Sequence, residues 1–125
     1  MRYFVSGHRD LTEQEFIEHY QSIIDDIIEQ DNYAEFVVGD WEGCDSLFIN
    51  YLNEEICGQK VHIYYVNTPR VCVNKENKQV LHKRDNYDEC DASMTKNSDF
   101  DIAWIRPGRE DSHTAKNIKR RYNLC

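Results

Sequence analysis

Apolar residues recur at helical spacing over residues 13–30. They form one broad stripe, as in a helix that lies on a sheet, made up of Phe16, Ile17, Tyr20, Ile23, Ile24, Ile27 and Ile28. Just before this stripe, Thr12 and Glu15 have the spacing of a capping box, and Leu11 stands where a hydrophobic staple would pack on Phe16. The pattern therefore predicts a helix over 13–30 with a well-defined start.

Four runs of β-branched and aromatic residues predict strands. They cover residues 2–6, 36–38, 61–66 and 100–105. The first two runs end alike, in Phe4-Val5-Ser6-Gly7 and Phe36-Val37-Val38-Gly39. Their separation is the length of one β-α-β crossover, which favours parallel strands.

Three more helices are predicted over residues 47–55, 87–96 and 114–122. The polar residues 74–78 form either a solvated loop or the turn between two short strands at 71–73 and 80–82. Strands that alternate with helices predict an α/β fold, because parallel neighbours require crossover connections. We expect a single Rossmann-like three-layer domain with a mostly parallel sheet over residues 1–125.

Composition narrows the class of partner. Fifteen Lys and Arg against 23 Asp and Glu give a net charge of −8, which repels phosphate polymers and anionic membrane surfaces and makes nucleic acid an unlikely partner. No apolar run approaches the ~20 residues that span a bilayer, so we expect a soluble, cytoplasmic protein with no membrane contact. Five widely spaced cysteines and five scattered histidines predict neither a disulfide framework nor a metal site, and no cofactor is expected.

The loops that follow the strands carry the candidate chemistry. In open α/β sheets, ligands bind at the carboxyl ends of the strands, which here are followed by loops 6–11, 39–46 and 106–114. Helix N-termini and arginines suit a phosphate, and carboxylates accept hydrogen bonds from ribose hydroxyls or base edges. We expect a nucleotide site formed by Ser6, Gly7, His8, Arg9, Asp10, Gly39, Asp40, Gly43, Asp45, Ser46, Arg106, Pro107, Gly108, Arg109, Ser112, His113, Thr114 and Asn117.

These residues also have purely structural interpretations. The glycines serve as turn residues, and three polar side chains serve as helix caps or turn acceptors: Asp10, Asp45 and Ser112. In this interpretation Arg106 and Arg109 are either solvated or form surface ion pairs with the nearby carboxylates of residues 110–111. Trp41, which lies on a loop, is the aromatic residue best placed to stack on a base.

The sequence resembles the Rossmann-type SLOG superfamily, which includes the LOG phosphoribohydrolases and DprA-like proteins. The segments that carry the resemblance are "RYFVSGHRDLT", "FVVGDWEGCDSLFINYL", "KRDNYDECDASMTKNSDFDIAWIRPG" and "DSHTAKNIKRR". Gly39, Asp40, Gly43 and Asp45 match a G-[GD]-x-x-G-x-D loop of one group. The last loop is similar to D-S-G-T-x-x-E of nucleoside 2-deoxyribosyltransferases, with matches at Asp111, Ser112 and Thr114. The resemblance implies a nucleotide or nucleotide-derived ligand.

Two departures from these motifs bear on catalysis. His113 replaces the glycine of the motif, and Asn117 stands where both enzyme groups carry the glutamate that cleaves the N-glycosidic bond. An amide is neither a nucleophile nor a general base at neutral pH. We therefore expect a binding function. The alternative is an N-glycosidic bond hydrolase or transferase that uses another carboxylate, for which Glu110 and Asp111 are the candidates.

The resemblance also bears on assembly and on nucleic acid. It implies a homodimer, whose surface we expect to come from the apolar residues of 47–56 and the tyrosines of strand 61–66. A DNA-binding protein like the DprA group is compatible with the fold but not with the charge.

Overall fold

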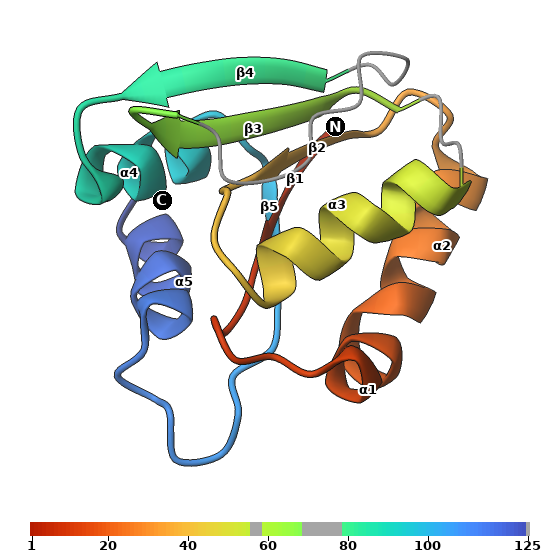
Figure 1. Ribbon diagram of the computed structural model, residues 1–125, viewed down its shortest axis with the longest axis horizontal. Coiled ribbons are helices and arrows are strands. Elements are labelled where there is room, and N and C mark those ends of the chain that lie inside the picture. Colours follow the sequence, from red (N-terminus) through yellow and green to blue (C-terminus); the bar gives the residue numbers. More distant parts are fainter. Residues whose placement is uncertain (56–58, 69–78, 125) are drawn as a thin grey trace.

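The protein folds around one five-stranded parallel sheet (Figure 1). The structure is a computed structural model that describes residues 1–55, 59–68 and 79–124. The strands β1 (Arg2–Ser6), β2 (Glu35–Val38), β3 (Val61–Val66), β4 (Gln79–Arg84) and β5 (Phe100–Ala103) lie in the order β4-β3-β2-β1-β5. Every pair of neighbours is parallel. The predicted strands are confirmed, although β5 ends two residues early, and the strand expected at 71–73 falls outside the described residues.

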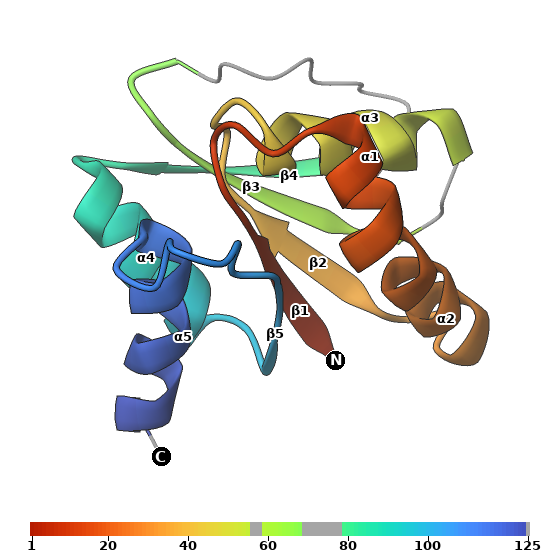
Figure 2. The same ribbon diagram turned by 90° about the horizontal axis from the view of Figure 1, so that it is seen from below.

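Helices cover both faces of the sheet, as Figure 2 shows. One face carries α1 (Glu13–Phe16), the π-helical turn η1 (Ile17–Gln21), α2 (Ser22–Gln30) and α3 (Cys44–Glu55). The other face carries α4 (Tyr87–Lys96) and α5 (His113–Leu124). The predicted α/β fold, a Rossmann-like domain of three layers, is therefore confirmed.

Alternation along the strands divides the core between the two faces. Val5 packs in the larger cluster under α1 to α3, whereas its neighbour Phe4 packs with Cys90 and Met94 of α4. Successive side chains of a strand point to opposite faces, so a sheet covered on both sides needs apolar residues at consecutive positions. This requirement explains the unbroken apolar runs in the sequence.

The helix predicted over 13–30 is present, but it is not uniform. Its start has the predicted capping box, in which Thr12 accepts from the Glu15 N–H and Glu15 accepts from the Thr12 N–H. Not all of the apolar stripe is covered, because Ile17 and Ile23 remain 46% and 47% exposed. The π turn η1 contains an extra residue and so rotates the apolar positions on either side of it.

The strand order reverses beside β1. β2, β3 and β4 are added one after another on one side of β1, and α4 then returns the chain so that β5 joins the other side of β1. The segments that follow β1 and β5 lead to helices on opposite faces. This reversal beside β1 is the place where open α/β sheets bind ligands.

Part of the surface expected for a homodimer is buried in this fold, although Leu47, Tyr51 and Tyr65 stay partly exposed. Phe48, Ile49 and Leu52 of α3 belong to the core, and Tyr64 is 3% exposed. α3 packs Phe48, Ile49 and Leu52 against the sheet. The apolar spacing of so short a helix did not indicate which of its faces is buried. Separately, none of the described helices combines the length and apolar character needed to cross a membrane.

Candidate functional site

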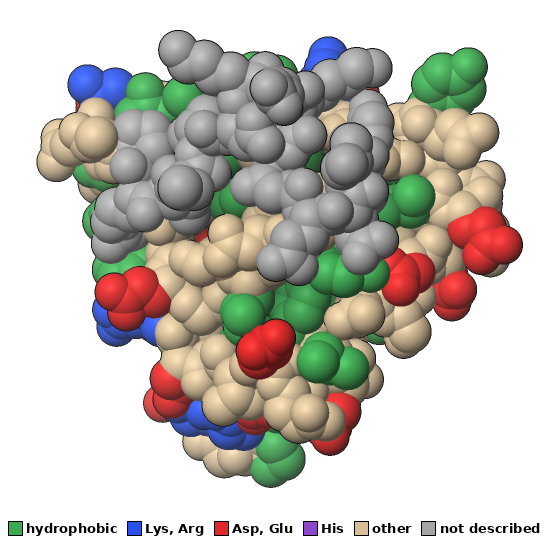
Figure 3. All heavy atoms as spheres, turned by 45° about the vertical axis from the view of Figure 1, so that its right-hand side comes forward, with side chains coloured by type: hydrophobic (Ala, Val, Ile, Leu, Met, Phe, Trp, Pro, Cys, Tyr) green, Lys and Arg blue, Asp and Glu red, His purple; other side chains and the backbone are tan. Residues whose placement is uncertain are grey.

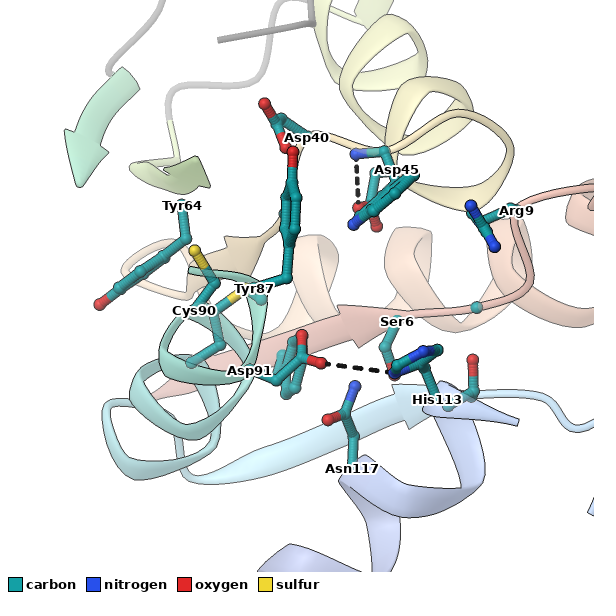
Figure 4. Close-up of a pocket in the computed structure, with 16 residues that line it drawn as sticks. Ser6, Arg9, Asp40, Asp45, Tyr64, Tyr87, Cys90, Asp91, His113 and Asn117 are labelled. Atoms are coloured by element: carbon teal, nitrogen blue, oxygen red, sulfur yellow. Dashed lines mark hydrogen bonds and ion pairs between the residues drawn. The ribbon is translucent and has the colours of Figure 1, made fainter. Parts of the chain in front are cut away.

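A cavity of about 300 Å³ lies at the carboxyl ends of β1 and β2, on the face covered by α4 and α5 (Figure 4). Its volume is at the lower end for small-ligand sites. The residues that line it are Phe4, Ser6, Gly7, Arg9, Gly39, Asp40, Trp41, Asp45, Tyr64, Tyr87, Cys90, Asp91, Met94, His113, Thr114 and Asn117. We describe it by two sides, a polar side formed by Ser6, Asp91, Thr114 and Asn117, and an aromatic side formed by Arg9, Trp41 and Tyr87.

Two buried side chains on the polar side have hydrogen-bonding groups without a partner. Ser6 is 6% exposed, and its Oγ makes no hydrogen bond within the described residues. Asn117 is 5% exposed, and its Oδ1 accepts from Nη1 of Arg120 over 2.8 Å. No acceptor for the Asn117 Nδ2 group is found in the described part of the chain. A ligand that accepts hydrogen bonds would satisfy both groups.

The N-terminus of α5 meets the same side of the cavity. Ser112 caps this helix, because its Oγ accepts from the Ala115 N–H and its carbonyl accepts from the Lys116 N–H. His113 and Thr114 open the helix and line the cavity. The backbone N–H groups of a first helical turn have no partner inside the helix, so they add donors and a partial positive charge.

Asp91 brings a carboxylate to this donor-rich side. Its side chain is 22% exposed, and its Oδ2 lies 3.9 Å from Nδ1 of His113, which is itself 75% exposed. Burial raises the pKa of the Asp91 carboxyl, and the charges of Arg120 and His113 oppose this effect. Figure 4 shows the Asp91 carboxylate turned towards His113, and it shows Ser6 and Asn117 on the same side of the cavity.

The aromatic side consists of stacked rings and one cation. The Trp41 and Tyr87 ring centroids are 4.8 Å apart, and the Arg9 guanidinium lies 4.6 Å from the centroid of the Trp41 ring. Arg9 forms no ion pair with any described residue. Stacked in this way, Arg9 keeps its N–H groups available to an acceptor at the mouth of the cavity.

Loop 39–46 is held by its own polar residues. Asp45 Oδ2 accepts from the Trp41 N–H over 3.0 Å, and Ser46 Oγ donates to the Trp41 carbonyl over 3.0 Å. Gly43 has a φ of +75°, and a Cβ there would lie 2.2 Å from the carbonyl oxygen of Arg9. These contacts fix both Trp41 and Arg9, so Asp45, Ser46 and Gly43 shape the site through the loop.

The arginines of loop 106–114 clamp this loop to Asp10 of the first loop and to Glu15 of α1. Arg106 donates to both carboxylate oxygens of Glu15, over 3.0 and 2.7 Å, and to Asp10 over 3.0 Å. Arg109 lies 3.6 Å from Asp10. The alternative interpretation, in which these arginines pair with residues 110–111, does not match these contacts, since the fold brings Asp10 and Glu15 to the arginines instead. Glu110 instead accepts from the Gly108 N–H.

His8, in the first loop, also contacts the clamped loop 106–114. Its Nε2 accepts from the backbone N–H of Arg106 over 2.8 Å, and its Nδ1 is buried without a partner in the described residues. Burial lowers the pKa of His8, and the nearby Arg109 and Arg106 lower it further. The neutral imidazole is thus the form that accepts the Arg106 N–H.

The cavity gathers part of the predicted site. The predicted residues that line it are Ser6, Gly7, Arg9, Gly39, Asp40, Asp45, His113, Thr114 and Asn117. The predicted residues that lie outside its lining are His8, Asp10, Gly43, Ser46, Arg106, Pro107, Gly108, Arg109, Glu110, Asp111 and Ser112. Most of the second group belongs to the turns and the clamp that hold the lining in place.

Sequence reasoning missed the contribution of α4. Tyr87, Cys90, Asp91 and Met94 stand at i, i+3, i+4 and i+7 of this helix and all line the cavity. A signal for them existed, because this spacing puts a carboxylate on an otherwise apolar helix face. Tyr64 of β3 was also missed as a lining residue.

No family model matches this chain, and no curated protein or solved structure matches it. Within the described residues, no group of three or more His, Cys, Asp and Glu side chains is arranged to hold a metal ion. The interpretation of the site therefore rests on its own geometry.

Proposed function

We propose that this protein binds a nucleotide or a nucleotide-derived ligand, with a phosphate on the polar side of the cavity. The observation that carries the proposal is the convergence, at the N-terminus of α5, of the buried Ser6 Oγ, which has no partner in the described residues, and the amide of Asn117, a buried residue whose oxygen is held by Arg120. Hydroxyl, amide and helix N–H donors are the groups that bind phosphate oxygens. Arg9 adds a cation to a chain that is otherwise acidic.

The remaining lining suits the other parts of a nucleotide. Away from the polar side, Asp40 and Asp45 supply acceptors for hydroxyl and amino groups, and Trp41 and Tyr87 supply aromatic surface for a base. A volume of about 300 Å³ is at the lower end of the range for small-ligand sites. We assign the phosphate to the polar side and not to Arg106 and Arg109, because those arginines are paired with Asp10 and Glu15.

The test is thermal unfolding in the presence of AMP, GMP, CMP or UMP and of the four matching nucleosides. We expect at least one monophosphate to raise the melting temperature by mass action, and its nucleoside to raise it less. Equal shifts for both would contradict the phosphate assignment. If no compound shifts the melting temperature at millimolar concentration, the proposal of nucleotide binding is wrong.

A matched pair of variants locates the binding. Ser6→Ala and Thr95→Val each remove a buried hydroxyl that has no partner in the described residues, but only Ser6 lines the cavity. We expect Ser6→Ala to weaken monophosphate binding about tenfold, the lower end of the range for a hydrogen bond to a charged group. Thr95→Val should leave the affinity unchanged. Equal affinities in the two variants would move the ligand away from Ser6.

Asp91 favours a second candidate function, the cleavage or transfer of an N-glycosidic bond. A carboxyl with a raised pKa inside a ligand cavity is suited to acid catalysis, and Asp91 faces the side on which Asn117 replaces the glutamate of the resembling enzymes. Release of free base from a bound nucleotide, detected by chromatography, would support it. Asp91→Asn should then abolish release, whereas Glu110→Gln and Asp111→Asn, outside the cavity lining, should not.

The homodimer implied by the resemblance remains part of the proposal, without a surface assigned to it. Sedimentation at micromolar concentration tests it, and a monomer there would remove the dimer and leave the proposed ligand site unchanged.

A further inference from the structure

We propose that Arg120, which does not line the cavity, is the positioning residue that decides what the polar side recognises. Arg120 lies three residues after Asn117 on α5, so the two side chains are neighbours on the helix surface. Its Nη1 donates to Asn117 Oδ1 over 2.8 Å. This inference rests on the proposed function, which it deepens by assigning the origin of the preference for a phosphate.

The reasoning starts from the two ends of an amide. A primary amide presents either an acceptor or two donors to a given side, and the choice depends on what holds the other end. Arg120 carries only donors, so it can hold Asn117 by its oxygen alone. The NH₂ group must then face the opposite way, and Figure 4 shows the amide nitrogen of Asn117 turned towards Asp91 and His113.

This orientation makes the polar side a site for an acceptor-rich group. With Asn117 fixed, Nδ2 joins the unpartnered Ser6 Oγ and the first N–H groups of the twelve-residue α5 as donors to the same cavity. A phosphate offers several acceptors to such a cluster, whereas a free 5′-hydroxyl satisfies fewer of them. If the amide were turned round, its oxygen would face the ligand phosphate and repel it.

The experiment compares the affinities for AMP and adenosine, measured calorimetrically, in the wild type, Arg120→Met and Lys119→Met. Lys119 is the matched control, because it is an exposed cation on the same helix that makes no hydrogen bond to Asn117 within the described residues. We expect the preference for AMP over adenosine to fall about tenfold in Arg120→Met, as for the loss of one hydrogen bond to a charged group. The affinity of Arg120→Met for adenosine should stay as in the wild type. The preference of Lys119→Met for AMP over adenosine should also stay as in the wild type. Arg120→Lys, which keeps the charge, should recover part of the preference.

Other outcomes overturn the proposal. An unchanged preference in Arg120→Met would show that Arg120 does not position the amide. An equal fall in Lys119→Met would show that only the charge of the helix matters. If Arg120→Met fails to fold, Asn117→Asp gives the second test: a carboxylate held by Arg120 should abolish AMP binding and spare adenosine, and retained AMP binding would be contradictory.

A measurement without ligand separates this inference from the proposed function. In NMR spectra of the ligand-free protein, the Asn117 side-chain NH₂ should show contacts to protons of Ser6 and Asp91, and these contacts should be lost in Arg120→Met and kept in Lys119→Met. Contacts that persist in Arg120→Met would overturn the role of Arg120 even if AMP binds. If none of the four monophosphates and nucleosides binds the wild type, the proposed function fails, and the NMR result still decides the orientation.

Discussion

Arg106 and Glu15 form a two-point ion pair that joins the loop after β5 to the first turn of α1. Nε and Nη2 of Arg106 donate to the two carboxylate oxygens of Glu15 over 3.0 and 2.7 Å. Glu15 also accepts from the Thr12 N–H in the capping box, so one carboxylate serves both the helix start and the clamp between the loops. Because α5 begins just after the clamped loop, this pair helps to set the position of His113 and Thr114 at the cavity.

The first prediction concerns acid denaturation. The hydrogen bonds from Arg106, followed by that from the Thr12 backbone, lower the pKa of Glu15 from 4.5 to about 2. A lowered carboxyl pKa contributes stability that is present above the unfolded pKa and is lost as the pH falls through the folded one. The urea concentration at the unfolding midpoint should therefore decrease as the pH is lowered from 4.5 to 2. Glu15→Gln, which retains the capping side chain, should make this decrease smaller. Glu13→Gln, in the same turn but without an ion pair in the described residues, should not.

The second prediction concerns the hydroxyl of Tyr20. It donates to the Ser6 carbonyl over 2.7 Å and accepts from the Trp104 N–H over 3.0 Å, and the residue is fully buried. Tyr20→Phe leaves two backbone groups without a partner at the carboxyl ends of β1 and β5. We expect a loss of about 1–3 kcal/mol in the free energy of unfolding, measured by urea titration. Tyr33→Phe, at an 88% exposed position, should change it by less than about 0.5 kcal/mol.

The third prediction contrasts two glycines with positive φ. Gly108, at +88°, has open space where a Cβ would lie, whereas a Cβ at Gly43, at +75°, would meet the Arg9 carbonyl. Gly108→Ala should cost about 1–2 kcal/mol for the left-handed backbone alone. Gly43→Ala should cost about 1–3 kcal/mol more, from the clash. Chemical denaturation measures both, and equal losses would show that loop 39–46 moves to relieve the contact.

The fourth prediction concerns a histidine pair away from the cavity. His82 lies with Nε2 2.9 Å from Nδ1 of His62, whose Nε2 contacts Glu35 at 2.7 Å. Burial lowers the pKa of His82 below 6.5, and the charges of His62, Arg84 and Arg2 lower it further. The unfolded chain then takes up a proton first, so stability should fall as the pH drops from 6.5 towards the folded pKa. Thermal melts from pH 7.5 to 5.5 measure this slope, which His82→Gln should flatten; an unchanged slope would refute the assignment to His82.

The sequence by itself determined the elements and the edge of the sheet that carries the candidate site. Local signals were sufficient for this purpose: the capping box at Thr12 and the apolar runs that end in Gly7 and Gly39 depend on residues close together in the chain. The bounds of α4 at Tyr87 and Lys96 were predicted for the same reason. Alternating strands and helices then led to a parallel sheet, with its loops gathered at one edge.

Only the tertiary structure decided which side chains meet at that edge. Asp91 reaches the cavity because the β4-to-β5 crossover lays α4 over β3, a placement that depends on strand order and not on the local sequence. Arg106 pairs with Glu15, 91 positions away, and not with the nearby carboxylates of residues 110–111. Packing brings the Arg106 guanidinium and the Glu15 carboxylate into two-point contact. The direction of the Asn117 amide likewise follows from a hydrogen bond to Arg120. A local sequence pattern indicates which groups are available for such contacts. Which groups pair depends on distances that arise only when the sheet and both helix layers have assembled.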